Sequence, residues 1–551
     1  MIRSNTLRTG LLAGITSAFI WVLAFPPFSI AEMGYLFAVP LLLWLMLARA
    51  EWKLCILVAH ISGSIAFLGT IIWLRHVTWP GLICLCFLLG LQWSLWVWLA
   101  KLLLGNWQLE SLDFSIRKFG GRLLPMLQLS AGWVALEWMR TWLFSGFPWA
   151  PLAASQWQRP AMLQILDITG AYGLSFVLIL FNCVMALTVL KFIRLSRTRA
   201  TATDNPEDPQ PENNGDSLRP PAEFYLGLAL VMACALLMVP SGYLKTDSSL
   251  PLLRVAPVQP AIEQTYGWDK QSASDTMDIL RFLTRTAALL EPDLILWPES
   301  ITPWPLEGHE DFLAFMEDEI AEIGVPLLTG NYADLGDFRY YNTVALISAE
   351  DGLYLPTYKK QKLVPFGEFV PFADILPLER LVGEGTFIPG KEARLIPFNG
   401  LNIASLICYE DVFPWIPRRF FVEGLARDST AEPDIYFVAA NNAWYGKEAC
   451  HEQHLMHSVL RAVETRRPFM RCGIDGWSGW IDEFGRIRHQ LEREGESYYF
   501  RGTEVMKVEA STIWQNRKSL YMRWGNWFVW LCLAILSVTF FTQMRTQKQF
   551  R

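Results

Sequence analysis

Charged residues are scarce in this sequence, and their scarcity excludes an ordinary water-soluble globule. Only 18% of the 551 residues are Asp, Glu, Lys or Arg, whereas 52% are hydrophobic, and the mean hydropathy is +0.24. Soluble domains carry about 25% charged residues. The sequence also lacks a long basic stretch, which a nucleic-acid-binding protein would need as its cationic footprint, and its net charge is -6. We therefore expect a membrane protein and no nucleic-acid partner.

A disulfide framework, a Gly-rich phosphate loop and a dinucleotide-binding fingerprint are also missing. Most of the nine cysteines lie in apolar runs, where a thiol behaves as a small hydrophobic group. The exceptions are Cys408, Cys450 and Cys472, which lie in a more polar part of the chain. One of these three is a candidate reactive thiol, and pairing of Cys450 with Cys472 stays open. The sequence predicts no cofactor.

Three histidines in the string HEQHLMH superficially resemble a metal site. His451, His454 and His457 are spaced i, i+3, i+6, whereas the zincin motif needs histidines at i and i+4. On a helix the outer two point about 120° apart. We therefore expect structural or solvent-exposed roles for them, and no metal site.

Long apolar runs are what the sequence has in place of charge. Eight stretches are long enough, or nearly so, to cross a bilayer. They run approximately over residues 11–25, 34–48, 54–73, 81–104, 125–144, 171–194, 223–240 and 524–543. The first ends in FPPF without a small-residue cleavage site, so we interpret it as an anchor and not as a signal peptide.

Lys and Arg in the short loops predict the orientation of these spans. With the N-terminus inside, the inner loops and tails hold fifteen Lys or Arg, and the outer loops hold only Arg75 and Arg159. Both termini are then cytoplasmic, and a polar insert lies outside, which in a bacterium means the periplasm. We expect a seven-span transmembrane domain over residues 1–240, the insert over 241–510, and a last span with its tail over 511–551. A polar linker near 200–222 is expected to be disordered.

The insert alternates short apolar strands with amphipathic helices, which predicts an α/β layered domain. The expected strands are Leu252–Gln259, Asp293–Trp297, Val325–Thr329, Asn342–Ser348, Asn402–Cys408 and Asp434–Ala440, and the expected helices lie near 270–290, 309–323 and 448–466.

Three polar residues of the insert suit nucleophilic acyl transfer. Glu299 follows the strand LILW, Lys360 lies in YKKQKLVPFGE, and Cys408 ends the strand NIASLI. Glu299 would accept the thiol proton, because the thiolate is the attacking species. Lys360 would stabilise the developing oxyanion and lower the pKa of the thiol. The competing interpretation of each residue alone is a buried Cys or a solvated Glu or Lys.

Around these residues the chain resembles the carbon–nitrogen hydrolase (nitrilase) superfamily, and most of all its membrane-embedded branch, the apolipoprotein N-acyltransferases. The matching strings are WPES, YKKQKLVPFGE, ICYE, NNAWYG (441–446) and QHLMHSVLRAVETRRPFMR (453–471). EWMR (137–140), SGFPWAPLAASQW (145–157) and GAYGLSF (170–176) match in the membrane half, so the resemblance covers nearly the whole chain.

The resemblance implies a polytopic α-helical membrane domain of eight spans plus an α/β, nitrilase-like αββα sandwich domain on the periplasmic side of a bacterial inner membrane. It implies an N-acyltransferase that moves an acyl chain from a phospholipid, with phosphatidylethanolamine the expected donor, to the N-terminal amine of the S-diacylglyceryl-cysteine of an apolipoprotein. The reaction would pass through a Cys thioester in ping-pong order and complete lipoprotein maturation. A membrane-tethered amidohydrolase with the same triad is the alternative.

The resemblance also implies roles for single residues. Glu299 would be the general base, Lys360 the oxyanion-stabilising cation and Cys408 the nucleophile. The supporting or substrate-binding positions would be Glu368, Tyr409, Glu410, Trp268 and Asn342. The chain departs from the family in two places: Asn442 stands where the family usually has Asp, and Ile474 stands at the start of its Asn-x-Gly-x-Ser strand. Both changes put lipid selectivity and secondary hydrogen bonding in question.

Two further features leave alternatives open. Glu137 and Arg140 lie three residues apart near the outer end of a span, where they form an intrahelical ion pair or contact a phospholipid head group or the catalytic domain. Phe366, Phe369 and Phe372 in FGEFVPF face the membrane interface or pack inside the domain.

Overall fold

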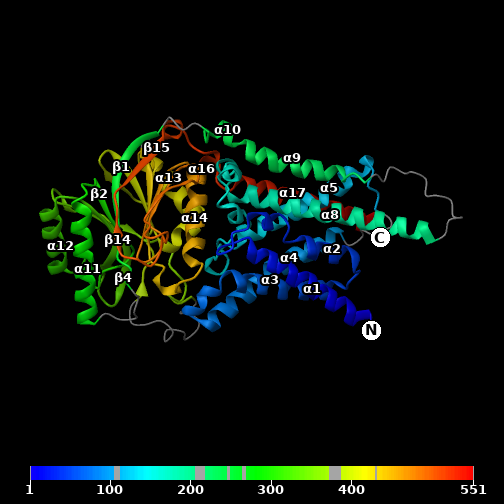
Figure 1. The fold of residues 1–551 in the computed structure, drawn as a ribbon, viewed down its shortest axis with the longest axis horizontal. Coiled ribbons are helices and arrows are strands. Elements are labelled where there is room, and N and C mark those ends of the chain that lie inside the picture. Colours follow the sequence, from blue (N-terminus) through cyan, green and yellow to red (C-terminus); the bar gives the residue numbers. More distant parts are fainter. Residues whose placement is uncertain are drawn as a thin grey trace. The chain divides into compact units, whose positions relative to one another are not determined.

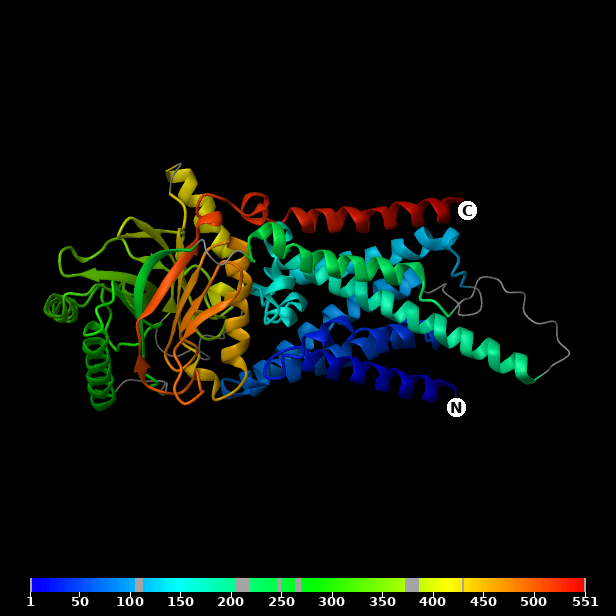
Figure 2. The ribbon, with the colours of Figure 1, turned by 45° about the horizontal axis from the view of Figure 1, so that its top comes forward.

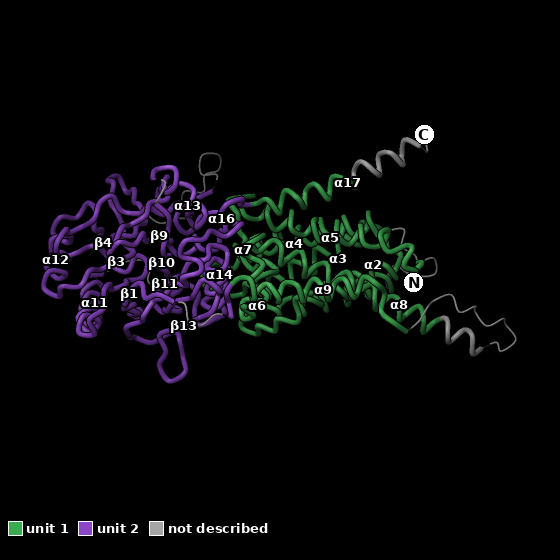
Figure 3. Tube along the Cα trace, turned by 90° about the horizontal axis from the view of Figure 1, so that it is seen from above, with its two compact units in different colours: residues 1–241, 526–551 green, residues 242–525 purple. Residues whose placement is uncertain are grey.

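The chain divides into two compact units. A computed structural model describes residues 2–104, 112–204, 218–244, 249–262, 269–371, 386–428 and 431–549. The first unit comprises residues 1–241 and 526–551, and the second comprises residues 242–525 (Figure 3).

The first unit is helical. Its long helices run alongside one another in both ribbon views (Figures 1 and 2). They are α1 (Ile2–Leu23), α3 (Trp52–Thr70), α4 (Trp79–Leu104), α5 (Phe119–Met139), α8 (Ala171–Asp204), α9 (Ala222–Leu236) and α17 (Trp527–Gln549), and α2 (Val39–Leu47) is shorter. Within the described residues, five helical segments are long and apolar enough to cross a membrane. These are Asn5–Leu23, Trp52–Thr70, Trp79–Leu104, Ala171–Arg197 and Ala222–Ser241.

The expected number of eight spans is therefore not confirmed. Helix α2 has 9 residues, which at 1.5 Å per residue is about 14 Å, far short of a hydrocarbon core of about 30 Å. Helix α5 is long enough but buries the polar side chains of Arg122, Gln128 and Glu137, and these lower its hydropathy. A hydropathy window cannot distinguish a polar residue that faces lipid from one that is buried against protein.

The polar linker was expected over residues 200–222. Helix α8 extends to Asp204 and α9 begins at Ala222, so the first residues of this stretch are helical. Residues 205–217 lie outside the described part of the chain.

Glu137 is buried at the end of α5, where it is 2% exposed. Its Oε1 accepts hydrogen bonds from the indole N–H of Trp133 (2.8 Å) and from the backbone N–H of Leu152 (2.7 Å). The guanidinium of Arg140 lies 5.2 Å from the centroid of the Phe67 ring. Glu137 therefore ties the segment after α5 back to that helix, a role that neither sequence interpretation included.

The second unit contains two stacked sheets in its described part. One holds β1 (Ser249–Gln259), β2 (Leu294–Trp297), β3 (Leu327–Asp334), β4 (Arg339–Ser348), β5 (Gly352–Leu353), β6 (Tyr358–Lys359), β7 (Thr386–Phe387), β14 (Gly502–Thr503) and β15 (Met506–Ser511). The other holds β8 (Leu395–Phe398), β9 (Leu401–Ile407), β10 (Ile435–Ala440), β11 (Phe469–Gly473), β12 (Gly479–Ile481) and β13 (Ile487–Gln490). Strands β1, β2 and β3 are parallel, as are β9, β10 and β11.

Helices cover both outer faces of the stacked sheets. Helices α11 (Lys270–Ala288) and α12 (Glu310–Ile323) pack on the sheet of β1, β2 and β4, and α13 (Trp415–Arg427) and α14 (Cys450–Thr465) pack on the other sheet (Figure 1). The order helix, sheet, sheet, helix is the expected αββα sandwich. All six expected strands and all three expected helices are present, with ends shifted by a few residues. Helix α13 and the remaining strands were not anticipated, and the strands of two residues are too short to show a periodicity.

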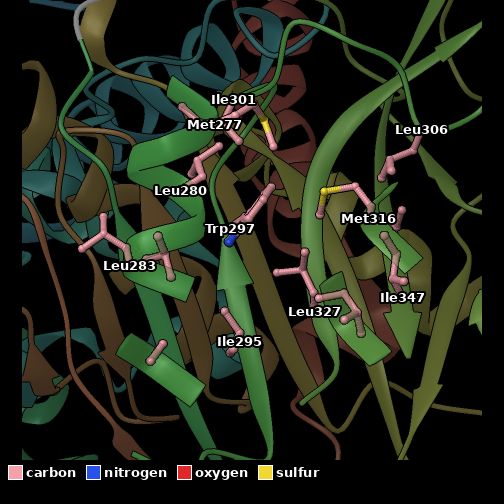
Figure 4. Close-up of a cluster of buried hydrophobic side chains, with 14 of the residues drawn as sticks. Met277, Leu280, Leu283, Ile295, Trp297, Ile301, Leu306, Met316, Leu327 and Ile347 are labelled. Atoms are coloured by element: carbon pink, nitrogen blue, oxygen red, sulfur yellow. The ribbon is translucent and has the colours of Figure 1, made fainter. Parts of the chain in front are cut away.

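The core beneath α11 fixes the strand that leads to Glu299. Met277, Leu280 and Leu283 recur every three residues on α11 and pack against Ile295 and Trp297 of β2 (Figure 4). The indole N–H of Trp297 donates to the hydroxyl of Thr284 on the same helix (2.9 Å). The last residue of β2 is therefore held by both apolar packing and a hydrogen bond.

Candidate active site

Glu299 begins a tight turn at the end of β2. The next residue, Ser300, has a positive φ of 49°, and its N–H donates to the carbonyl of Gly330 on β3 (3.1 Å). A Cβ at position 330 would lie 2.7 Å from the Cα of Glu299 and 2.7 Å from the carbonyl oxygen of Pro298. Only glycine at position 330 allows this approach, so β3 sets the position of the Glu299 carboxylate.

The ammonium of Lys360 lies between two carboxylates. Its Nζ is 2.9 Å from Oε1 of Glu299 and 2.8 Å from Oε1 of Glu368, and the lysine side chain is 1% exposed. Lys360 directly follows β6, and its backbone N–H donates to the carbonyl of Asn342 on β4 (2.8 Å). Pairing of β6 with β4 therefore carries the lysine to Glu299, 61 residues away in sequence.

Asn342 completes this cluster from β4. Its side-chain amide donates to Glu299 Oε1 (2.9 Å) and to Glu368 Oε1 (3.1 Å). Each of these carboxylate oxygens thus receives an N–H from Asn342 and another from Lys360. The resemblance placed Asn342 near the substrate, and in the described structure it is 2% exposed and orients the two carboxylates.

Cys408 stands where β9 ends and a 3₁₀ turn, η7 (Cys408–Val412), begins. Its φ is +48°, a left-handed conformation that residues with a Cβ rarely adopt. Cys408 is 8% exposed. Its thiol lies 3.7 Å from the carbonyl oxygen of Asn441, which directly follows the neighbouring strand β10. The carboxyl ends of β9 and β10 therefore bring the sulfur and a backbone acceptor together.

Charges around Cys408 keep its thiol neutral at rest. Burial raises the pKa of Cys408 above its ordinary value, the Glu299 carboxylate raises it further, and Lys360 lowers it only in part. Lys360 thus lowers the pKa of Cys408, as expected, but the combined effect of burial and Glu299 is larger. Burial alone would lower the pKa of Lys360, but Glu299 and Glu368 hold it well above its ordinary value, so the ammonium stays charged. Such a thiol needs a base to react.

Glu410 anchors the turn that carries Cys408. Its carboxylate accepts from the backbone N–H of Ile407 (2.8 Å) and of Gln361 (2.6 Å), and the hydroxyl of Tyr358 lies 2.9 Å from both oxygens. Burial raises the pKa of Glu410 to about 7. The side chain is 0% exposed. Glu410 therefore links the segment that carries Lys360 to the turn that carries Cys408.

The remaining sequence candidates are placed as follows. Glu368 contacts Lys360 and also accepts from the backbone N–H of Val364 (2.7 Å). The ring of Tyr409 packs edge-on against Phe413 at 4.9 Å. Phe366 is 55% exposed. Trp268 and Phe372 lie outside the described residues. All nine cysteines are free, so Cys450 and Cys472 do not form a disulfide.

Three polar residues around the site were not identified from the sequence as site residues: Tyr332, Asp411 and His454. Tyr332 on β3 lies within electrostatic reach of Glu299, Glu368 and Lys360, and burial raises its pKa to about 12. His454 and Asp411 bond to each other behind Cys408. Asp411 directly follows the ICYE string, and this position is the sequence signal that could have identified it. The histidine run was expected to have structural or solvent-exposed roles, and the structural alternative holds: His451, His454 and His457 are at most 2% exposed, because α14 is buried along its length.

This arrangement can perform acyl transfer. It combines a buried thiol, a carboxylate beside it and a fixed ammonium, which are the parts that nucleophilic acyl chemistry needs. Within the described residues, no group of three or more His, Cys, Asp or Glu is placed to hold a metal ion. The sandwich fold with this site defines the class as a carbon–nitrogen hydrolase-type enzyme.

Comparisons with known proteins support the class and narrow it. Residues 254–509 match the carbon–nitrogen hydrolase family, and residues 17–184 match the apolipoprotein N-acyltransferase N-terminal domain. The apolipoprotein N-acyltransferase of Geobacter metallireducens is 28% identical over 96% of this chain and 94% of its own length. That of Azotobacter vinelandii is 30% identical over 75% of this chain and 72% of its own length. The chain belongs to the apolipoprotein N-acyltransferase family and is an enzyme.

The close approach of Gly330 to Glu299 gives a prediction. Gly330→Ala should displace the Glu299 carboxylate and reduce acyl-transfer activity by about a hundredfold, because small displacements of a reacting group cost that much. Activity of the purified protein in detergent measures the loss. Gly121→Ala is the matched control, because no heavy atom lies within 4 Å of a Cβ there. Equal activity of both variants would show that β3 does not position Glu299.

Proposed function

We propose that this enzyme transfers an acyl chain from a phospholipid to the N-terminal amine of a diacylated apolipoprotein, through a thioester on Cys408. The observation that carries the proposal is the buried Lys360 ammonium, which is held by Glu299 and Glu368 within electrostatic reach of the Cys408 thiol. Membership in the apolipoprotein N-acyltransferase family supports the choice of acceptor.

In the first half-reaction Glu299 takes the proton of the Cys408 thiol while the sulfur attacks the ester carbonyl of the phospholipid. Negative charge then develops on the carbonyl oxygen, and the ammonium of Lys360 stabilises it. When the intermediate collapses, the C–O bond breaks and Glu299 returns the proton to the departing lysophospholipid oxygen. The acyl group remains on sulfur as a thioester.

In the second half-reaction the apolipoprotein amine attacks the thioester carbonyl. Glu299 accepts a proton from the nitrogen, the C–S bond breaks, and the proton passes to the sulfur to restore the thiol. The product is an amide. The alternative amidohydrolase would use water in this step and requires an open route for water, whereas the relatives are named for transfer to an amine.

We also propose that phosphatidylethanolamine is the donor, that the protein lies in the bacterial inner membrane, and that the catalytic unit is periplasmic. The Lys and Arg bias of the short loops supports this orientation, since positive loops stay in the cytoplasm.

The central test is product formation by the purified full-length protein. With phosphatidylethanolamine vesicles and a diacylated lipopeptide, mass spectrometry should detect an N-acylated peptide and, without the peptide, an acyl group on Cys408. Cys408→Ser should abolish the covalent intermediate, because a hydroxyl is a weaker nucleophile in the same site. Cys472→Ser should keep it. A thioester on Cys450 or Cys472 would overturn the assignment.

The two glutamates near the nucleophile should behave differently. Glu299→Gln should slow formation of the acyl-enzyme by about 10²–10⁴-fold, because it removes the base. Glu410→Gln should still form it, more slowly, and should destabilise the protein by about 1–3 kcal/mol, because it disturbs a buried acceptor. Rapid-quench mass spectrometry and thermal unfolding separate the two effects. Normal acylation by Glu299→Gln would require another base.

Reporter fusions test the orientation. Alkaline phosphatase, which is active only outside the cytoplasm, should be active when fused after Leu244 and inactive when fused after Arg551. A cytoplasmic fluorescent reporter should give the opposite pattern. Phosphatase activity at the C-terminal fusion alone would reverse the proposed topology.

A further inference from the structure

The carbonyl group of Cys408 has a side-chain partner of its own. Nε2 of His454 lies 3.0 Å from this oxygen, and His454 comes from α14, 46 residues further along the chain. The contact is made to Cys408, whose φ is +48°. A left-handed residue with a Cβ persists only where the surroundings hold it. The histidine is therefore placed to hold the strained peptide that carries the thiol.

His454 is itself fixed by a buried carboxylate. The same Nε2 lies 2.8 Å from Oδ1 of Asp411, whose Oδ2 accepts from the Ser458 hydroxyl (2.5 Å) and from Nη1 of Arg471 (2.8 Å). These side chains are at most 2% exposed. His454 and Arg471 hold the pKa of Asp411 well below its usual range, although its burial acts in the other direction. Asp411 is thus a permanent negative charge that receives three donors.

The contacts of His454 determine where its proton lies. Nε2 faces two acceptors, the Cys408 carbonyl and Asp411, so this nitrogen must carry the hydrogen. Burial, reinforced by Arg471, lowers the pKa of His454 below its ordinary value, and Asp411 acts in the other direction. Nδ1 lies 3.1 Å from the side-chain oxygen Oδ1 of Asn442, which is also an acceptor.

We propose that His454, oriented by Asp411, is a positioning residue for the nucleophile. Its Nε2–H donates to the carbonyl of Cys408 and holds the turn in the conformation that aims the thiol at Glu299 and the substrate carbonyl. His454 does not exchange a proton with the thiol, because both of its nitrogens are engaged elsewhere. The proposal rests on the proposed function, in which Cys408 becomes acylated.

The test compares substitutions of His454 in the full-length protein in detergent. His454→Leu removes the N–H but keeps bulk, and His454→Gln places an amide N–H near the position of Nε2. Single-turnover acylation of Cys408 by a range of phosphatidylethanolamine concentrations, followed by mass spectrometry, gives a rate constant and a half-saturation concentration. His457→Leu is the matched control, because His457 lies on the same helix and is 0% exposed. Thermal unfolding is recorded for every variant.

We expect His454→Leu to reduce the acylation rate constant by about ten- to a hundredfold while the half-saturation concentration stays within about twofold. His454→Gln should recover the rate to within about threefold of the unmodified protein, and His457→Leu should acylate normally at whatever stability it retains. A purely structural histidine would give equal losses in His454→Leu and His457→Leu and no recovery with Gln, which would overturn the proposal. Absence of acyl-Cys408 in the unmodified protein would instead refute the proposed function.

Discussion

The site depends on one electrostatic constraint, which is that the ammonium of Lys360 is buried and must be neutralised. An unpaired buried cation is strongly unfavourable, and Glu299 and Glu368 compensate it from either side. Burial raises the pKa of the adjacent Cys408, Glu299 raises it further, and Lys360 offsets this only in part. The same cluster thus holds a charged ammonium near a thiol that stays protonated at rest. A thiol held in this state is protected from side reactions of a standing thiolate.

Backbone geometry places these groups as much as side-chain attraction does. Ser300 and Cys408 both have positive φ at the point where a buried strand ends, and each is held by contacts to a neighbouring segment. Gly330 allows β3 to approach Glu299, and Glu410 ties the Lys360 segment to the Cys408 turn. The reacting groups therefore lie on the ends of packed strands, where neighbouring strands limit their movement. Preorganisation of this kind lowers the reorganisation needed during reaction.

Buried polar groups of the helical membrane unit are paired with other groups of the same unit. Glu137 is 2% exposed, and its Oε1 accepts from an indole and a backbone amide. Arg122 forms a buried ion pair with Glu223 at 2.8 Å. Polar groups in an apolar helical unit are costly unless they are paired inside the protein, and these contacts let α5 carry polar residues that lower its hydropathy. A lipid donor accounts for a membrane unit much larger than an anchor for the catalytic unit would need.

The sequence by itself determined the class of fold, the strands of the catalytic unit and the identity of Glu299, Lys360 and Cys408 as candidates. Each of these follows from local pattern, an apolar run that ends in a reactive residue, together with strings shared with a family. Only the tertiary structure showed that Asn342 joins the two carboxylates, that β3 must carry glycine at position 330, and that His454 is buried against Asp411 behind the nucleophile. Such contacts depend on which strands and helices become neighbours. Periodicity records the face of an element that is buried, but it carries no information about the element that buries it.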